Sequence, residues 1–565
     1  MRLKKILLLL ALNIFIYNAF AQNKLINPLD GKLLLSANYG ELRSMHFHSG
    51  VDLKVGGVPG AKIYAVDDAY VYRLSVSPSG YGNGVYLKHS NGNISVYGHL
   101  HQFGATLAKF IKAEQYKRNS FVIDTTFSEP VFTVKRGEII GFAGNSGSSF
   151  GAHLHFEIRD SLNVPLNPIA KFYNVADKTP PTIKSLTVFT FDDLENVRFT
   201  RTVKDILLKN VKGKHNISET IEIESPAFFG VEAFDNVDET YNKLGVRKIA
   251  VTLDNAEIFS CYLDSIGFEK DRYINSFQAY NLLLNENRNV MKTYIERGNK
   301  LNKYQNVVNS GIVEISDSLT HKISITLEDD YKNKSILNFN VKAKKKSAEN
   351  YISTADKKGR RIAWNTGDTI IYSGACIIVQ PETFYDNAYI EFEKSDTVIT
   401  DFSSVYSVNL NSMPLHKSLD IIVKAKVAEK LRDKIMLGGL RNGKIFAVDA
   451  QYLMGFAKAK ISSSANYFVT VDTVSPRITP KFKDGADLRK QTNLKITIAD
   501  NLSGIQKYAG YIDDKWALFE YDAKNNLLTY TFDSEHIARN KKHTLKLIVS
   551  DKKNNTAVFE SSFLW

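Results

Sequence analysis

Residues 151–159 read Gly-Ala-His-Leu-His-Phe-Glu-Ile-Arg, and polar and apolar side chains alternate along this segment with a period of two. The alternation predicts a β-strand with one core face and one solvent face, because successive side chains of a strand point to opposite sides. His153, His155 and Glu157 share the polar face. Two imidazoles two residues apart can serve one metal site, one as ligand and one as base, but such a pair alone does not establish a metal site.

A second segment, about a hundred residues upstream, supplies complementary ligands. It reads His-Phe-His-Ser-Gly-Val-Asp over residues 46–52, and in an extended chain His48 and Asp52 lie on the same face. With one histidine of the downstream pair they provide two imidazoles and one carboxylate. Three protein ligands and one open position are typical of a catalytic zinc site. Seven of the 12 histidines fall between residues 46 and 155, which supports this grouping.

The N-terminus has the pattern of a secretory signal peptide. Basic residues precede an apolar run over residues 6–12, and Ala-Phe-Ala at residues 19–21 forms a small-residue cleavage site. We expect residues 1–21 to be removed on export; the alternative is a membrane anchor, although Asn13 and Asn18 interrupt the apolar segment. No later segment has 18 consecutive apolar residues, so we expect no membrane span after cleavage. The mature protein is expected to be periplasmic, or secreted and associated with the cell wall.

Composition favours several mainly β domains. A mature chain of roughly 540 residues suggests three to five domains. Tyr and Phe are abundant (28 and 33) and few long helical periodicities occur, which favours β structure. The formal net charge of +13 suits an anionic surface such as a cell wall, or serves solubility alone. No basic and aromatic nucleic-acid motif is present, so we expect no nucleic-acid partner.

Residues 22–172 are rich in glycine and β-forming residues, and they predict a compact antiparallel β domain. The glycine-rich residues 80–84 indicate a hairpin. Residues 94–101 predict a strand on which Tyr97, His99 and His101 share one face. A glycine-serine loop over residues 145–149 directly precedes the strand of His153.

Four motifs in this domain resemble the lysostaphin/LytM-type zinc metallopeptidases, which have a duplicated hybrid motif fold and cleave peptide cross-links of bacterial peptidoglycan. The motifs are His48-x3-Asp52, Tyr97-Gly98-His99-Leu100, the glycine series of residues 137–147, and His153-Leu154-His155-Phe156-Glu157. The resemblance implies one zinc ion held by His48, Asp52 and His155. It also implies that His153 is the base and that His99 is a second catalytic histidine that stabilises the transition state.

The expected chemistry is consistent with these residue types. Zinc held by imidazoles and a carboxylate lowers the pKa of its water to about 7, and an imidazole with an ordinary pKa of about 6.5 can take the proton. We therefore expect an exported zinc-dependent endopeptidase that acts on peptidoglycan. The alternatives are a non-catalytic wall-binding relative that activates or positions another hydrolase, and a structural adhesin. The intact ligand set favours the enzyme.

Several residues of this domain have two interpretations. His89 is expected to be structural, while His46 and His101 flank the motifs and either line the groove or do not touch substrate. Tyr81 either lines the groove or packs in the core. Residues 102–133 are expected to form a flap beside the groove, with a helix from residue 105 and strands near residues 121–123 and 131–133; the alternative is a surface insertion without function.

The rest of the chain predicts further β domains. Residues 173–345 and 471–565 are expected to be immunoglobulin-like β-sandwiches, the first with an insertion near residues 268–310, and residues 346–470 a further sandwich-like domain. Similar linkers, Asp-Lys-Thr-Pro-Pro at residues 177–181 and Val-Asp-Thr-Val-Ser-Pro at 471–476, open the two modules. Their expected roles are spacing, wall attachment or docking of a protein partner.

The sequence has only two cysteines, Cys261 and Cys376, and we expect both to be buried free thiols. The sequence leaves open which peptide bond is cleaved. It also leaves open whether the segment near Asn38 blocks the zinc.

Overall fold

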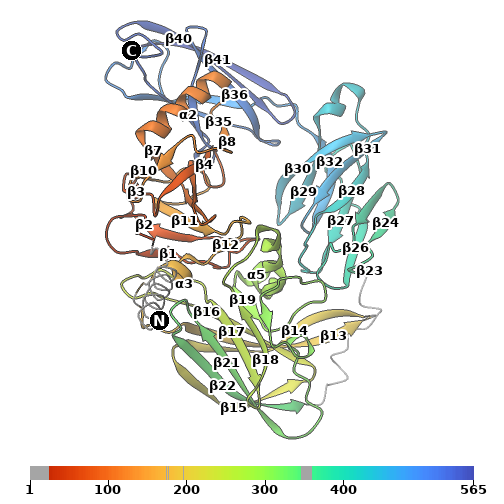
Figure 1. Ribbon diagram of the computed structural model, residues 1–565. Coiled ribbons are helices and arrows are strands. Elements are labelled where there is room, and N and C mark those ends of the chain that lie inside the picture. Colours follow the sequence, from red (N-terminus) through yellow and green to blue (C-terminus); the bar gives the residue numbers. More distant parts are fainter. Residues whose placement is uncertain (1–24, 174, 176, 195, 345–358) are drawn as a thin grey trace, which may run out of the picture.

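The computed structural model describes residues 25–173, 175, 177–194, 196–344 and 359–565 (Figure 1). The predicted signal peptide lies outside these residues. Strands far outnumber helices and almost all strand pairs are antiparallel, which confirms the prediction of a mainly β chain. Within the described ranges, no helix is both long and apolar enough to cross a membrane.

The N-terminal domain (residues 25–173) is built around a large antiparallel sheet. Its strands, in spatial order, are β1 (Leu35–Ala37), β2 (Val51–Lys54), β11 (His153–Arg159), β6 (Ile94–Gly98), β5 (Gly84–His89), β4 (Ala69–Val76) and β8 (Ile123–Thr126). Two short strands extend it, β9 (Thr133–Val134) on β4 and β12 (Pro165–Leu166) on β11. The helix α3 (Pro168–Phe172) follows β12.

A second, three-stranded sheet completes this domain. It contains β3 (Lys62–Tyr64), β10 (Ile139–Ala143) and β7 (Leu100–Phe103). The apolar core gathers side chains from both sheets, among them Leu74, Leu154 and Ile140, and all three are almost fully buried.

Strand β11 lies between β2 and β6, and its register brings the candidate ligands together. His155 is paired with Asp52 on β2 and with Gly98 on β6. The segment before β2 runs very close to β11, since a Cβ atom at Gly50 would lie 2.4 Å from the carbonyl oxygen of Phe156. Only glycine permits this approach, and it holds His48 next to His155.

The segment of residues 102–133 is not a free flap. Its helix α2 (Ala105–Arg118) packs on the N-terminal domain through Leu107 and Ile111. The other side of α2 contacts the C-terminal domain (residues 473–565), as Figure 1 shows. Tyr116 stacks on His536, with ring centroids 3.7 Å apart, and Lys112 pairs with Asp533. The expected helix is present, but it serves as a platform for a domain about 400 residues later.

The second domain (residues 177–344) consists of two sheets that enclose one core. The four-stranded sheet has the order β14 (Val197–Val211), β13 (Thr182–Leu194), β16 (Ala227–Phe234) and β19 (Val290–Lys292). The six-stranded sheet has the order β15 (Lys214–Glu224), β22 (Lys334–Lys344), β21 (Thr320–Glu328), β17 (Lys248–Leu253), β18 (Ala256–Tyr262) and β20 (Tyr304–Gln305). Short helices between β18 and β19 include α4 (Ile274–Phe277) and α5 (Tyr280–Glu286).

The third domain (residues 359–472) is one continuous ten-stranded sheet rather than two separate ones. In spatial order it contains β23 (Arg360–Ile362), β26 (Ala388–Ser395), β27 (Val405–Asn409), β32 (Ala465–Val471), β29 (Ile435–Arg441), β30 (Lys444–Leu453), β31 (Phe456–Ile461), β28 (Leu419–Lys424), β25 (Ala375–Val379) and β24 (Asp368–Tyr372). The sheet curls around its core, so that the edge strand β24 approaches β26. The long strand β30 makes the sheet continuous, because its first part pairs with β29 and its last part pairs with β31.

The C-terminal domain again has two sheets around a core. One contains β33 (Arg477–Pro480), β35 (Asn493–Ala499), β39 (Leu527–Thr531) and β38 (Phe519–Asp522). The other contains β34 (Ala486–Asp487), β41 (Thr556–Leu564), β40 (Lys542–Asp551), β36 (Ile505–Ile512) and β37 (Lys515–Ala517). Both cysteines of the chain are free, as predicted, although Cys376 is only half-buried.

The four domains form a closed circuit of contacts. Asn38 of the first domain bonds Gly245 of the second, and the Gly298 amide of the second donates to the Tyr385 carbonyl of the third. The third contacts the fourth through an ion pair of 2.6 Å between Lys553 and Asp449. The fourth returns to the first through α2, so the last domain lies against the first (Figure 1).

We predict that Tyr116→Ala loosens the C-terminal domain from α2. The substitution removes the stack on His536 and an edge contact of 5.2 Å with Trp516, and each such ring pair contributes about 0.5–1.5 kcal/mol beyond its buried area. Amide hydrogen exchange in α2 and β38 should become faster. Tyr241→Ala is the control, because this tyrosine is 98% exposed; equal exchange in both variants would contradict the docking role.

Candidate metal centre

Strand β11 carries the polar face that its sequence predicts. Leu154, Phe156 and Ile158 lie in the apolar core, and His153, His155 and Glu157 lie on the opposite side. The expected solvent face is nevertheless buried at two of its three positions, because His155 is 4% and Glu157 is 0% exposed. Side chains from other segments cover this face, so its polar groups must be satisfied within the protein.

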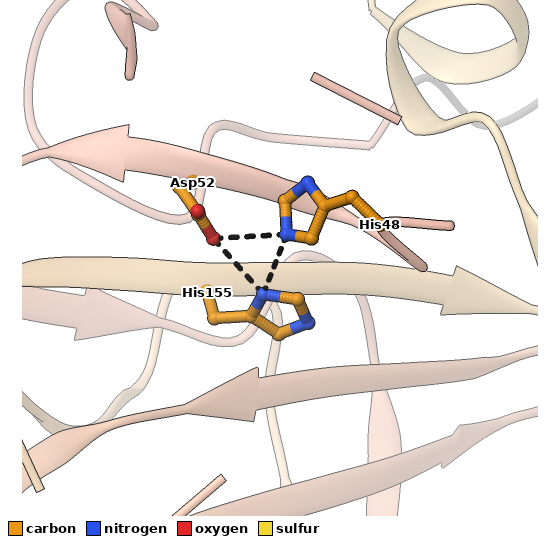
Figure 2. A group of neighbouring side chains, drawn as sticks. All are labelled: His48, Asp52 and His155. Atoms are coloured by element: carbon orange, nitrogen blue, oxygen red, sulfur yellow. Dashed lines mark hydrogen bonds and ion pairs between the residues drawn. The ribbon is translucent and has the colours of Figure 1, made fainter. Parts of the chain in front are cut away.

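Three side chains converge on one point, as Figure 2 shows. The Nε2 atom of His48 lies 3.1 Å from Nδ1 of His155 and 3.1 Å from Oδ1 of Asp52. The distance between Nδ1 of His155 and Oδ1 of Asp52 is 3.0 Å. The structure thus brings together the three residues that the sequence resemblance assigns to zinc.

Hydrogen bonds on the far side of each ring determine which nitrogen is free. Nδ1 of His48 lies 2.8 Å from the Asn38 carbonyl oxygen, and Nε2 of His155 lies 2.8 Å from a Glu157 carboxylate oxygen. Because these oxygens only accept hydrogen bonds, the neutral rings carry their protons there. The lone pairs of His48 Nε2 and His155 Nδ1 then both face Asp52. Two lone pairs and a carboxylate oxygen at contact distance fit a divalent metal ion, and zinc prefers this donor set.

Without a metal ion, a proton has to occupy this cluster. Burial lowers the pKa of His155, but its hydrogen bonds to Asp52 and Glu157 outweigh burial and raise the pKa to about 9. Burial would raise the pKa of Asp52, yet the neighbouring histidines His48, His153 and His155 hold it well below its usual value. The metal-free cluster therefore keeps a positive charge on His155 at neutral pH.

Glu157 holds the ring of His155 in this orientation. Its carboxylate accepts hydrogen bonds from Arg159 Nε at 2.6 Å, from Tyr81 Oη at 2.6 Å and from Ser49 Oγ at 2.8 Å. Burial alone would raise the pKa of Glu157, but the charges of Arg159 and His155 hold it well below the usual value. Tyr81, for which the sequence left two interpretations, thus belongs to the support of the site.

His99 does not lie on a continuous strand, so the prediction of one face for Tyr97, His99 and His101 is wrong. The chain leaves the large sheet at Gly98 and enters the small sheet at Leu100. His99 lies between them with φ of 61°, a left-handed conformation that is uncommon for residues with a side chain. The break buries Tyr97 in the core, brings His99 beside the metal centre and leaves His101 exposed.

His99 and His153 are held in the same way as the ligands. Nδ1 of His99 lies 2.8 Å from the Ser146 carbonyl, and Nδ1 of His153 lies 2.9 Å from the Gly151 carbonyl. The two rings make an edge contact with centroids 4.9 Å apart, and Nε2 of His153 lies 3.4 Å from Oδ1 of Asp52. Burial and the neighbouring histidines lower the pKa of His99 to about 3, so this ring is neutral at physiological pH.

Other residues singled out by the sequence lie outside this cluster. His89 is structural, as expected, since its ring nitrogens contact the Asp68 carbonyl at 3.1 Å and Ser95 Oγ at 2.8 Å. His46 is exposed. The Asn38 side chain is directed away from the candidate ligands, because it bonds Gly245 and Asp330 of the second domain.

Two contributors to the site were not identified from the sequence. Arg43 donates to the second oxygen of Asp52 over 3.2 Å, and Ser49 supports Glu157. Neither residue belongs to a spacing pattern that would have identified it. Arg43 places a positive charge beside the candidate metal ligand, and its side chain is 36% exposed.

The C-terminal domain contacts a loop next to the site. A cavity of about 840 Å³ lies between the two domains, and its lining includes His101 and Ser146 on one side and Glu520 and Lys524 on the other. Lys524 donates to the carbonyl oxygens of Asn145 and Gly147. These residues flank Ser146, whose carbonyl orients His99, so the C-terminal domain contacts the loop that holds a candidate catalytic group.

Comparison with known proteins gives two family matches. The sequence profile of peptidase family M23 matches residues 46–116, and the profile of the Zu5-like domain matches residues 360–472. Both matches fall within single domains of the structure.

Two curated relatives match a limited part of the chain. The DD-carboxypeptidase/endopeptidase Mpg of Neisseria meningitidis serogroup B is 30% identical over 129 residues, 23% of this chain and 24% of the relative. An uncharacterized metalloprotease of Haemophilus influenzae is 33% identical over 110 residues, 20% of this chain and 18% of the relative. The chain thus spans about a quarter or less of the length of these relatives.

Among solved structures, a point mutant of the catalytic domain of the prophage-encoded M23 protein EnpA from Enterococcus faecalis is 25% identical. The alignment covers 25% of this chain and 93% of that domain, with a TM-score of 0.19. The catalytic domain of the antimicrobial peptidase lysostaphin from Staphylococcus simulans is 21% identical, with coverage of 24% and 90% and a TM-score of 0.19. The profile match and the four sequence motifs agree with each other, and the N-terminal domain is therefore similar to the lysostaphin/LytM-type peptidases of family M23.

Proposed function

We propose that the protein is an exported zinc-dependent endopeptidase that hydrolyses peptide cross-links of bacterial peptidoglycan. The observation that carries the proposal is the convergence of His48 Nε2, His155 Nδ1 and Asp52 Oδ1, with both histidine lone pairs directed to one point. The family match and a relative named as a carboxypeptidase and endopeptidase support the substrate class. Removal of residues 1–21, with Arg2, Lys4 and Lys5 and no acid, lowers the net charge from +13 to +10, and this positive charge supports association with an anionic wall.

His48, Asp52 and His155 would hold one zinc ion per chain. When bound, zinc supplies Lewis acidity, which polarises a peptide carbonyl and makes water acidic near neutral pH. Glu157 would keep His155 oriented and increase its basicity as a ligand, as hydrogen-bonded partners of metal-binding histidines do.

His153 is placed to act as the general base. Its Nδ1–H donates to the Gly151 carbonyl, so the lone pair of Nε2 is free on the side of Asp52, 3.4 Å from Oδ1. A neutral imidazole at this position can accept the proton of an attacking water and deliver it to the leaving amine.

His99 would act on the developing negative charge. Its Nδ1–H is engaged by Ser146, and the ring starts neutral because its pKa is lowered to about 3. A neutral ring in this tautomer offers a lone pair at Nε2, which can accept a hydrogen bond from the attacking water or from a substrate N–H; with a proton at Nε2 the ring would donate to the oxyanion. The ring of His153 lies beside it, with centroids 4.9 Å apart.

We predict different effects for the two histidines of β11. His155→Ala should lose zinc and all cleavage, because it removes a ligand. His153→Ala should keep zinc but lower kcat/KM about 10²–10⁴-fold, the usual contribution of a general base. Zinc content and conversion of cross-linked muropeptides to monomers, analysed by mass, measure both effects.

His321→Ala, a histidine of the second domain that pairs with Asp254, is the control. A wild-type protein without zinc would contradict the metal centre. A zinc-loaded wild-type protein that leaves cross-links intact would contradict the substrate.

We predict that Glu157→Gln weakens zinc binding while the ligands stay in place. The amide removes a charge that fixes His155 and neutralises Arg159, and loss of such support costs about 10–100-fold in metal affinity. Chelator competition measures the affinity. Glu129→Gln is the matched control on an exposed loop of the same domain, and equal affinities for both variants would show that Glu157 has no role in binding.

We predict that zinc affinity increases with pH up to about 9. Below this pH the metal-free protein carries an extra proton on His155, whose pKa is raised to about 9, and that proton must leave when the metal binds. The affinity should therefore rise about tenfold per pH unit between about pH 6.5 and 8.5. Titration in buffers of different ionisation enthalpy counts the released proton; a constant affinity over this range would refute the assignment.

A further inference from the structure

Two groups of carboxylates lie far from the candidate metal centre, one in each of two domains. In the second domain, side-chain oxygens of Asp177, Asp235 and Asp329 lie within 4.8 Å of one another. Asp472, the last residue of the third domain, forms a group of the same size with Asp500 and Asp551 of the C-terminal domain. We call these groups the first and the second aspartate triad.

The two triads occupy corresponding places in the chain. The first aspartate of each lies in the linker that precedes the domain, before β13 or before β33. The second directly follows β16 or β35 and is followed by asparagine (residues 235–236 and 500–501). The third lies in or beside the hairpin turn of β21 and β22 or of β40 and β41. The same three positions of two domains therefore supply the carboxylates.

The hydrogen bonds within the triads also correspond. Asn333 donates to the Asp177 carbonyl oxygen at 3.2 Å and to Asp329 Oδ2 at 2.8 Å. Asn555 donates to the Asp472 carbonyl oxygen at 2.9 Å and to Asp551 Oδ2 at 2.7 Å. In each domain an asparagine four residues after the third aspartate thus ties the linker to the hairpin. The arrangement is repeated in detail, which a chance clustering of acids would not produce.

The negative charge of the triads is not balanced by the protein. Among the described residues, none of the six aspartates forms an ion pair with Lys, Arg or His. Asp235 is 1% exposed, and its Oδ1 has no hydrogen-bond partner within the part of the chain that the structure describes. Oδ1 of Asp500, which is partly buried, also has no hydrogen-bond partner among the described residues, while its Oδ2 accepts from the Leu502 and Gly504 amides. Unpaired carboxylates buried side by side are destabilising unless a proton or a cation neutralises them.

The raised pKa values in the first triad agree with the need for a neutralising group. Burial, Asp329 and Asp177 together raise the pKa of Asp235 to about 8, and burial raises the pKa of Asp329 to about 6. At neutral pH, Asp235 would therefore be mostly protonated, and a cation beside it would be needed to keep it ionised.

We propose that each aspartate triad binds one Ca²⁺ ion and thereby fixes the linker in front of its domain. The donors are oxygens only, with neither histidine nor cysteine, which favours a hard cation over zinc. The irregular linker and turn segments suit the flexible coordination of Ca²⁺ better than the strict octahedron of Mg²⁺. Through Asp177 and Asp472, the ions would set how the second domain follows the first and how the C-terminal domain follows the third.

The test uses the full-length, zinc-loaded protein and titrates Ca²⁺ to about 5 mM. Calorimetry should give two Ca²⁺ ions per chain, and Ca²⁺ should raise Tm by several degrees. Asp235→Asn and Asp500→Asn should each leave one ion, and the double variant should bind none. Glu535→Gln is the control, because Glu535 belongs to an exposed acidic group that pairs with Lys112; this variant should still bind two ions.

Several results would overturn the proposal. Wild-type protein that binds no Ca²⁺ at about 5 mM refutes it even if the variants fail to fold. Two bound ions that persist in the double variant would place Ca²⁺ elsewhere. Loss of Ca²⁺ binding in His155→Ala, with no effect of Asp235→Asn or Asp500→Asn, would show that the ion enters the metal centre. The test is independent of the proposed function, because binding is measured without peptidoglycan.

Discussion

The buried charge of Glu157 is the constraint on which the geometry of the candidate metal centre depends. In an interior of low polarity, an ionised carboxylate has to be surrounded by donors, and here Arg159, Tyr81, Ser49 and His155 provide them. The bond to His155 uses Nε2, which leaves Nδ1 as the nitrogen that faces His48 and Asp52. The second domain takes part as well, because Phe268 covers the Arg159 guanidinium at 4.7 Å.

Local patterns made much of this site predictable. Alternation over residues 153–159 indicated the strand, and the spacing of His48 and Asp52 indicated the other ligands. The register of β2 on β11 then brings Asp52 opposite His155. The place of His99 could not be predicted in the same way, because its left-handed backbone results from a change of sheet between β6 and β7. Likewise, no spacing marks Ser49 or Arg43, which contact the site only after folding.

Contacts between distant segments could not be predicted from the sequence. Tyr116 and His536 stack although about 420 residues separate them, and from the sequence the segment of helix α2 was therefore expected to be a flap beside the groove, or a surface insertion, rather than a contact to the C-terminal domain. The linkers at Asp177 and Asp472 were recognised as similar boundaries, but the aspartates that join them come from strand ends and hairpins elsewhere in each domain. Sequence patterns that repeat along a chain predict its domains. Sites formed by residues from distant segments can be located only once the fold is known.

The position of the C-terminal domain has a consequence for the order in which the protein is completed. This domain supplies one side of the cavity next to His101 and Ser146, yet it is the last part of the chain to be synthesised. At about 5–20 residues per second, roughly 20–80 s pass between completion of the first domain and completion of the last. Until the C-terminal domain is in place, the cavity lacks Glu520 and Lys524, and the loop of residues 145–147 lacks the hydrogen bonds from Lys524. The surroundings of His99 are therefore completed only when the last domain docks.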